Sequence, residues 1–503
     1  MNSPNATAPM PPAQASRGWI LSALMITMML AAMDTTIVST VIPQIVDDLG
    51  GFALFAWVFS IYMLAQTVVI PIYGKLADQY GRKPVLLGGT LLFLIGSAAC
   101  ASAWDMPSLI IFRAIQGLGA GSIMATVNTL AGDLFEVRER ARVQGWLSSV
   151  WGLSAIAGPT LGGILVEYVS WRWIFLVNLP VGAVALVMIG VFLHENVEKR
   201  SHQIDYLGSL LILLTVGTLV FGLLQTGNSW PLRSGYTLAW GIAVFVLAVA
   251  TVQIEKRAAE PVLPGWLWRR RVLLGSNLGM VAMGILMMGP IAYLPTFVQS
   301  THGVGTMVAG LVLATMSIGW PLASSLSGKL YLKIGFRNTA LAGALLAGGA
   351  CLAFLGLPQQ IAIGWIALDQ FFFGAGLGLI STSLLVGVQS TVGWSQRGVV
   401  TGANMFSRNL GQTLGAAIFG AIFNAVLAKQ LVDAPQALAA ELPREVNQIM
   451  ETLHSAAIPH DALRYVQHAI YGATDAIYVG VLMFAVLAFV FIAITPKHFA
   501  ANE

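Results

Sequence analysis

Charged residues are scarce in this sequence, at 10% of its 503 residues against about 25% in a typical soluble domain. Hydrophobic residues make up 57%, and this composition predicts an all-α polytopic membrane protein. Cysteine is also rare. Cys100 and Cys351 both lie in apolar runs, which disfavours a disulfide framework and a thiolate metal site. The 7 histidines lie outside these runs, which disfavours a histidine proton relay inside the membrane.

Apolar runs of about 20 residues, the length that crosses a bilayer as a helix, recur along the chain. The first is too long for the apolar part of a signal peptide, so we interpret it as a span. An even number of spans places both termini on one side of the membrane. We count fourteen, with approximate bounds 19–43, 52–76, 84–103, 107–132, 143–166, 173–193, 205–226, 234–254, 272–299, 306–331, 339–356, 361–388, 398–427 and 471–494.

Basic residues are distributed unevenly between the segments that connect these runs. If the N-terminus is cytoplasmic, 19 of the 26 Lys and Arg residues lie inside and 5 lie outside. Positive charge is enriched in cytoplasmic loops, so the bias predicts a multi-pass protein of the cytoplasmic (inner) membrane with both termini inside. The two remaining residues, Arg113 and Arg408, lie within apolar runs.

An internal repeat relates the two ends of the chain. Residues 74–76 match 328–330 and the glycine-rich residues 117–121 match 374–378, so the offset between copies is nearly constant. Two six-helix halves with a site between them are typical of transporters. The predicted organisation is a disordered cytoplasmic tail (1–18), an N-terminal six-helix half (19–193), two inserted helices (205–254), a cytoplasmic amphipathic connector (255–271), a C-terminal six-helix half (272–494) with an extracytoplasmic loop (428–470), and a cytoplasmic tail (495–503).

The first run contains a carboxylate, Asp34. A charge near the centre of a spanning helix costs roughly 2.5–3.5 kcal/mol, so it is rare unless it faces a polar interior and has a function. At about 1.5 Å per helical residue in a core about 30 Å thick, Asp34 lies roughly 8 Å below the outer edge and Arg113 roughly 9 Å below it. We predict that the two interact, and protonation of Asp34 would weaken the attraction, as in a proton switch. The alternative is a static pair that packs helices.

The loop 74–84 joins the second and third runs. Gly81 is expected to turn the chain with positive φ, and Asp78 and Arg82 are spaced to pair. The loop resembles the signature loop of the major facilitator superfamily, Gly-x-Leu-Ala-Asp-Arg-x-Gly-Arg-Lys, with Gln79 in place of the usual Arg. The resemblance implies a gate that latches the two halves together on the cytoplasmic side, and a loop that only sets topology is the alternative. The gating residues would be Gly74, Asp78, Gly81, Arg82 and Lys83.

The fifth run contains a group of small residues around a proline. Small residues let helices approach closely, and Pro159 is expected to bend the helix. The segment resembles the antiporter motif of the superfamily's exporters, with Ser154 in place of its first glycine. That motif marks antiporters rather than symporters, and ordinary glycine-rich packing is the alternative. The motif residues here are Gly158, Pro159, Gly162 and Gly163.

Residues 34–38, the segment 171–180 and the fourteen runs together resemble the fourteen-helix drug:proton antiporters. The resemblance covers nearly the whole chain and implies the major facilitator fold, two six-helix halves plus two inserted helices. It implies that Asp34 is the coupling carboxylate and that Arg113, in an Arg-x-x-x-Gly-x-Gly element, takes part in proton transfer. It also implies a monomer that needs no cofactor beyond the coupling protons.

A second acid, Asp369, lies in the twelfth run about 12 Å from the outer edge. It is a candidate for binding a cationic substrate or a second proton, and a solvated or paired acid near the interface is the alternative. In the superfamily the first, fourth, seventh and tenth core helices line the cavity, and Met and aromatic side chains suit a pocket for varied apolar shapes. The predicted cavity residues are Gln116, Met287, Tyr293, Gln299, Gln370 and Phe372, for some of which lipid contact is the alternative.

These features predict a proton-coupled antiporter that exports hydrophobic or cationic compounds by alternating access. An exporter of one narrow substrate, such as a lipid, antibiotic or metabolite, is the alternative. A membrane-embedded enzyme is disfavoured because no His/Asp or Cys/His constellation is visible near a membrane surface. The expected partners are small molecules and membrane lipid, with no nucleic acid.

Overall fold

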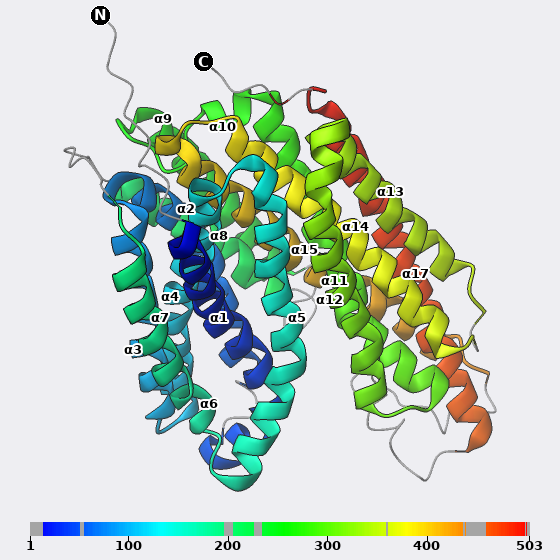
Figure 1. Cartoon of the computed structure of the whole chain (residues 1–503). Coiled ribbons are helices and arrows are strands. Elements are labelled where there is room, and N and C mark those ends of the chain that lie inside the picture. The colour runs from blue at the N-terminus through cyan, green and yellow to red at the C-terminus, as the bar shows by residue number, and fades with distance from the viewer. Residues whose placement is uncertain are drawn as a thin grey trace, which may run out of the picture.

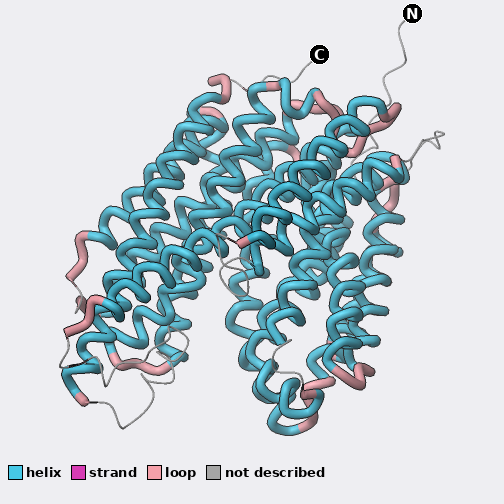
Figure 2. Tube along the Cα trace, turned by 180° about the vertical axis from the view of Figure 1, so that it is seen from behind, coloured by secondary structure: helices cyan, strands magenta, loops and turns pink. Residues whose placement is uncertain are grey.

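The computed structural model describes residues 14–50, 55–195, 205–225, 234–358, 361–435, 438, 459–497 and 499. These residues are helical and contain no strand (Figure 2). The helices are α1 (Gln14–Leu49), α2 (Phe55–Tyr80), α3 (Arg82–Ala101), α4 (Met106–Leu134), α5 (Val137–Tyr168), α6 (Trp173–Leu176), α7 (Asn178–Phe192), α8 (Tyr206–Gln225), α9 (Gly235–Arg257), α10 (Trp266–Arg269), α11 (Arg271–His302), α12 (Thr306–Ile334), α13 (Phe336–Leu355), α14 (Ile363–Ser390), α15 (Arg397–Val432) and α17 (His460–Ile494), with a 3-10 turn η2 (Trp394–Gln396) before α15.

Each of the fourteen apolar runs forms a helix, the sixth as α6 followed by α7. Within the described residues, 12 helices are long and apolar enough to cross a membrane, or 13 if the bent α5 counts as one span, and α8 is a shorter apolar helix. The all-α membrane fold is therefore confirmed. Helix α5 bends by 40° between Val137–Ala155 and Thr160–Tyr168. Pro159 lies between these two segments, and a proline inside a helix bends it because it removes a backbone hydrogen bond.

The helices form two packed groups, blue to cyan and green to red in Figure 1. One apolar core lies mainly among α1, α2, α3, α4, α5 and α7, and a second lies among α11, α12, α13, α14 and α17. Glycines bring the backbones together at corresponding places in the two groups: a Cβ at Gly119 would lie 2.4 Å from Phe93 N, and one at Gly376 would lie 2.7 Å from Ala347 N. The exact domain boundaries stay a prediction.

The two groups meet mainly through two helix pairs, α2 with α15 and α5 with α12, and also where α4 meets α15 and α5 meets α14. At the first contact a Cβ at Gly74 would lie 2.5 Å from the carbonyl oxygen of Gly398, so neither position has room for a side chain. The start of α1 and the end of α17 lie on the same side of the molecule (Figure 1), which we call the terminal side. The Gly74–Gly398 contact lies on this side, because α15 begins there.

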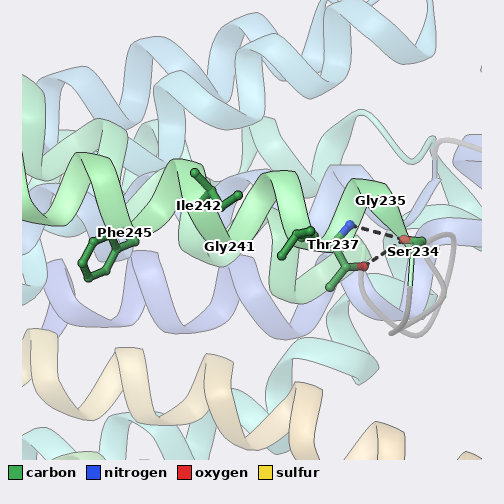
Figure 3. Close-up of a pocket in the computed structure, with 7 residues that line it drawn as sticks. Ser234, Gly235, Thr237, Gly241, Ile242 and Phe245 are labelled. Atoms are coloured by element: carbon green, nitrogen blue, oxygen red, sulfur yellow. Dashed lines mark hydrogen bonds between the residues drawn. The ribbon is translucent and has the colours of Figure 1, made fainter.

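The inserted helices lie outside both groups, since α9 packs against α8 and α8 packs against α2 and α15. A surface hollow of about 730 Å³ runs along α9 and is lined by residues of that helix and its cap alone (Figure 3). Ser234 caps α9 by accepting a hydrogen bond from the Thr237 N–H at 3.3 Å. Phe245 is 70% exposed on this face. One apolar helix face does not enclose a ligand, and it suits contact with lipid.

Several predicted boundaries are wrong by a few turns, because polar end turns carry no hydropathy signal. Helix α1 begins at Gln14, inside the predicted disordered tail, and α17 begins at His460, before the predicted residue 471. The extension of α11 and α17 places His302 and His468 inside helices rather than outside them. Within the predicted amphipathic connector the helical residues are the end of α9 and the single turn α10. Most of the predicted 428–470 loop lies outside the described residues.

On the side opposite the termini, the end of α1 is tied to the segment before α6. Asp48 accepts hydrogen bonds from Trp171 Nε1 at 2.9 Å and from Arg172 Nη1 at 2.7 Å. These two hydrogen bonds, that of Trp171 first, hold the pKa of Asp48 below its ordinary value. The pair is half-exposed, so its contribution to stability is small.

Candidate functional site

A buried ion pair joins α1 to α4. Arg113 Nη1 lies 2.5 Å from Asp34 Oδ2, and the two side chains are 0% and 1% exposed. The depth argument from the sequence placed both residues near one level, and the structure brings them into direct contact. A charge-assisted contact is stronger than a neutral hydrogen bond, and its position away from water makes the pairing obligatory while both groups are charged.

Neutral donors from two further helices complete the surroundings of Asp34. Gln116 Nε2 donates to Asp34 Oδ1 at 2.7 Å, and Asn178 Nδ2, at the start of α7, approaches the same oxygen at 3.4 Å. Ser97 Oγ accepts hydrogen bonds from both amides, at 3.2 and 3.0 Å. The Asp34 carboxylate is therefore held by three side chains, and every contact changes when it gains a proton.

Arg113 is fixed independently of Asp34 by three neighbours. Its Nε donates to the Val58 carbonyl at 3.2 Å and its Nη1 donates to Gln116 Oε1 at 2.8 Å. Its guanidinium carbon lies 4.1 Å from the centre of the Tyr62 ring. These contacts hold the cation in place when Asp34 is neutral, so the pair is able to break without moving Arg113.

The α5 segment that resembles the antiporter motif packs directly against the Asp34 turn of α1. A Cβ at Gly158 would lie 2.1 Å from Thr36 Oγ1 and 3.2 Å from Ile37 N. Thr36 Oγ1 also donates to the Ser154 carbonyl of α5 at 2.9 Å. Gly163 differs, since nothing lies within 4 Å of a Cβ there. The motif thus packs α5 against Thr36, two residues after Asp34 on α1.

We expect Gly158→Ala to destabilise the protein, because the new methyl group overlaps Thr36 and forces α1 and α5 apart. Overpacking of this kind costs about 1–3 kcal/mol. The measurement is the apparent melting temperature of the purified protein in detergent, with Gly163→Ala as the matched control because its Cβ meets open space. Equal melting temperatures for the two variants would contradict this account of α1–α5 packing.

A second polar cluster lies on the terminal side and joins the two helix groups. Asp78 Oδ1 and Oδ2 accept hydrogen bonds from the backbone N–H groups of Gly398 and Val399, at 2.9 and 2.8 Å. N–H groups in the first turn of a helix have no acceptor within the helix, and the helix dipole favours a carboxylate there. Asp78 therefore caps a helix of the other group.

Arg82 is the centre of this cluster and is 0% exposed. It donates to Asp78 Oδ1 at 2.7 Å, to Asp133 Oδ2 at 2.8 Å and to the Trp394 carbonyl at 2.6 Å. Asp133 Oδ1 in turn accepts from Arg397 Nη1 at 2.6 Å. We call these four charged residues, Asp78, Arg82, Asp133 and Arg397, the latch.

The other residues of the predicted gating loop have different places. Gly81 turns the chain with φ +97°, as predicted, and Gly335 does the same in the second copy of the loop with φ +86°. Gly74 makes the close approach to Gly398 described above. Lys83 Nζ donates to the Gly190 carbonyl at 2.8 Å, so it bonds within its own helix group rather than across to the other.

The candidate second acid, Asp369, is buried in the C-terminal helix group and has no described cation beside it. Its Oδ2 accepts a hydrogen bond from Gln370 Nε2 at 3.0 Å, and the same amide nitrogen lies 3.0 Å from Tyr478 Oη. Its Oδ1 has no hydrogen-bond partner. Asp369 therefore lacks the fixed guanidinium that Asp34 has.

Two predicted cavity residues are fully buried in this arrangement, and their place in a substrate cavity stays a prediction. Gln116 and Gln370 are both 0% exposed, and their amides bond to side chains of other helices in their own group. Tyr293 is stacked against Phe423 with ring centres 4.7 Å apart, and Met287 Sδ accepts a hydrogen bond from Gln412 at 3.4 Å. Phe372 is 45% exposed and Gln299 is partly buried.

A small internal pocket of about 40 Å³ lies between the two helix groups. Its polar lining comes from both groups, and we call it the central pocket. Its members include Asn128 and Gln144 on one side and Ser381, Thr382, Asn404 and Arg408 on the other.

Sequence reasoning missed the partners that complete the two clusters. Tyr62, Ser97, Asp133 and Arg397 carried no motif that assigned them a role. The available signal was chemical, since Asp133 is an acid at the end of an apolar run. Its partner Arg397 is 264 residues away in the chain, which sequence spacing does not connect.

Comparison with known proteins places the whole architecture in one family. The family model described as the Major Facilitator Superfamily matches residues 24–416. "Multidrug resistance protein 3" of Bacillus subtilis (strain 168) is 34% identical over 421 residues, 84% of this chain and 82% of its own length. "Multidrug transporter protein MdtP" of the same organism is 33% identical over 424 residues, 84% of this chain and 78% of its own length.

Solved structures show the same fold at low sequence identity. The human organic anion transporter MFSD10 (TETRAN) superposes with a TM-score of 0.63 at 16% identity, over 96% of this chain and 100% of that one. A bacterial homologue of the iron transporter ferroportin, in an outward-facing state, superposes with a TM-score of 0.59 at 13% identity, over 94% and 99% of the two chains.

Proposed function

The chain belongs to the Major Facilitator Superfamily of membrane transporters, and from this premise we propose that it is a proton-coupled antiporter. It exports hydrophobic or cationic compounds across the cytoplasmic membrane, with both termini on the cytoplasmic side. The substrate class is supported by relatives that are named as multidrug transporters. The single observation that carries the coupling is the buried Asp34–Arg113 pair.

In the proposed cycle a proton from the outside binds Asp34. The neutral carboxyl then loses most of its attraction to Arg113, which Tyr62 and Val58 keep in place. Because α5 packs on the adjacent turn of α1 through Gly158, a shift of α1 moves α5 and its partner α12 in the other helix group. This linkage couples the protonation state to the relative position of the two groups.

The latch supplies the second element that alternating access requires. It holds α15 against α2 on the terminal side, so it closes the cytoplasmic face in the proposed orientation. Breaking and re-forming the latch would alternate the face that is open. A chain of this family carries no catalytic chemistry of its own, and protons are the coupling ion in this proposal.

The test is the uptake of ethidium, a fluorescent cation, into inside-out membrane vesicles that hold the protein. A proton gradient is generated by respiration, and uptake is followed before and after an uncoupler is added. We expect gradient-dependent uptake that stops when the uncoupler collapses the gradient. Uptake that continues at the same rate after uncoupling would contradict proton coupling, whereas vesicles without the protein give the background.

A further inference from the structure

Arg408 is a cation inside the membrane-spanning part of α15, and it has no partner among the described residues. It lies eleven residues after the start of α15 at Arg397, roughly 16 Å along a helix that crosses a core about 30 Å thick. Its Nε is buried without a hydrogen-bond acceptor, and its side chain has no ion pair or hydrogen bond within the described chain. No described acid lies close enough to act on its charge.

This isolation separates Arg408 from Arg82 and Arg113, the two fully buried arginines among the described residues. Arg82 is held by two carboxylates and Arg113 by Asp34. A guanidinium is always charged in proteins and offers five N–H donors, so an unpaired one near mid-membrane is unfavourable unless an acceptor joins it during the working cycle.

Arg408 lines the central pocket, where the two helix groups meet. The pocket holds a second unsatisfied polar atom, since Asn404 Oδ1 is buried without a donor while its Nδ2 donates to Asn277 Oδ1 at 3.3 Å. On the facing group Gln144 Nε2 donates to Asn128 Oδ1 at 3.2 Å, so these amides are already engaged with each other. The two lining atoms that are buried without a hydrogen-bond partner in the described chain, Asn404 Oδ1 and Arg408 Nε, are therefore both on α15.

The remaining walls of the pocket are apolar or weakly polar. Met280, Trp320, Leu385 and Met405 supply the apolar part of the lining, beside the hydroxyl groups of Ser148, Ser381 and Thr382. A volume of about 40 Å³ holds no more than a few waters, so the pocket must widen before a drug-sized compound can enter it. Its place between the groups means that their relative motion changes its size.

We propose that Arg408 binds a carboxylate, or a similar anionic oxygen group, of the exported compound. This inference rests on the proposed export function and refines its substrate class: the site accepts acidic and zwitterionic compounds, not hydrophobic cations alone. The planar guanidinium donates two parallel N–H groups to the two carboxylate oxygens, while the apolar walls contact the rest of the molecule.

The test is equilibrium binding of two dyes that differ by one group. Rhodamine 110 carries a free carboxyl group, and rhodamine 123 is its methyl ester. Fluorescence anisotropy gives the Kd of each dye for the purified full-length protein in lipid nanodiscs. We expect the wild type to bind the acid more tightly than the ester. Arg408→Gln should weaken acid binding by about tenfold or more, because a hydrogen-bonded charge pair is lost, and leave ester binding nearly unchanged.

Two further variants separate a binding role from a structural one. Arg408→Lys keeps the charge but loses the two-pronged geometry, so its Kd for rhodamine 110 should fall between those of the wild type and Arg408→Gln. Lys333→Gln removes an exposed positive charge from α12 and should change neither Kd. The proposal would be overturned if Arg408→Gln weakened the binding of both dyes equally. It would also be overturned if the wild type bound rhodamine 110 no more tightly than rhodamine 123.

The source of the anionic group is tested in the same assay. Lowering the chloride concentration, with sucrose added to hold the osmolarity, should leave the ratio of the Kd values of rhodamine 110 and rhodamine 123 unchanged if the substrate itself supplies the carboxylate. A Kd of rhodamine 110 that tightens while that of rhodamine 123 stays the same would assign Arg408 to a small inorganic anion and overturn the proposal. Binding is measured without a proton gradient, so it tests the Arg408 site separately from transport. If the dyes bind as expected but are not exported, the result contradicts the antiporter proposal and still supports the Arg408 site.

Discussion

Asp34→Asn is expected to reduce gradient-driven substrate uptake into inside-out vesicles to the background of vesicles without the protein. Asn is isosteric with Asp but carries no titratable proton, so the switch between a charged and a neutral side chain is lost. The substitution also breaks the buried ion pair and leaves the Arg113 guanidinium without its carboxylate, which costs about 3–5 kcal/mol. Arg113 keeps its contacts with Val58 and Tyr62, and folding of the variant is measured beside transport.

Folding of the Asp34→Asn variant is checked by its yield as a single species in size-exclusion chromatography. The matched control is Asp369→Asn, which neutralises a buried acid that has no described cation beside it. We expect this control to keep gradient-driven uptake. The reverse pattern, with Asp34→Asn active and Asp369→Asn inactive, would move the coupling site to Asp369 and contradict the present account.

Arg82→Gln is expected to open the terminal side of the protein. Arg82 lies between the Asp78 and Asp133 carboxylates, which are 4% and 6% exposed, so its removal leaves two buried negative charges close together. Breaking a buried ion pair in this way costs about 3–5 kcal/mol. The contacts of Arg82 with Asp78 and Asp133 lie within one helix group, and Arg82 reaches the other group at the Trp394 carbonyl. The closed arrangement carries the cost because both carboxylates are buried in it.

Opening is measured with a single reporter, Ser381→Cys, which lines the central pocket from α14. A membrane-impermeant maleimide is applied to the terminal side, and the native thiols Cys100 and Cys351 are buried, so the background is low. Labelling should be at least about tenfold faster with Arg82→Gln, since a tenfold change in population corresponds to about 1.4 kcal/mol. Asp78→Asn, which loses an acceptor for the first turn of α15, should act in the same direction.

Lys83→Gln is the control for this experiment, because it removes one positive charge from the same loop without touching the latch. Lys83 bonds to Gly190 in its own helix group. Its labelling rate should equal that of the wild type. A rate that rises as much in Lys83→Gln as in Arg82→Gln would show that loop charge in general, rather than the latch, keeps the terminal side closed.

Much of the architecture follows from the chain's local physics. The length of the apolar runs predicts the helices. The helical rise of about 1.5 Å per residue is enough to place Asp34 and Arg113 at a similar depth in the membrane. Gly81 is predicted to turn the chain because glycine adopts a positive φ more readily than other residues, and its φ of +97° confirms this. These inferences use information within one helix or one loop.

The contacts that the sequence does not predict depend on which way each side of a helix faces. Hydropathy does not distinguish a side chain that faces a cavity from one that bridges helices within a group, so it does not predict that Gln116 and Gln370 are fully buried in networks in this arrangement. The latch could not be completed for a similar reason, since Asp133 and Arg397 meet only after both groups have folded. Register between distant helices is set by packing, which a single sequence does not display.

The most direct test of the central claim is to measure the proton flux that substrate drives through the protein. Proteoliposomes that hold purified wild type or Asp34→Asn are loaded with a pH-sensitive dye under an imposed proton gradient, and ethidium is added. We predict that substrate dissipates the gradient with the wild type and not with Asp34→Asn, while both catalyse gradient-independent exchange of labelled substrate. Substrate-driven proton flux of equal size in the variant would contradict the assignment of the coupled proton to Asp34.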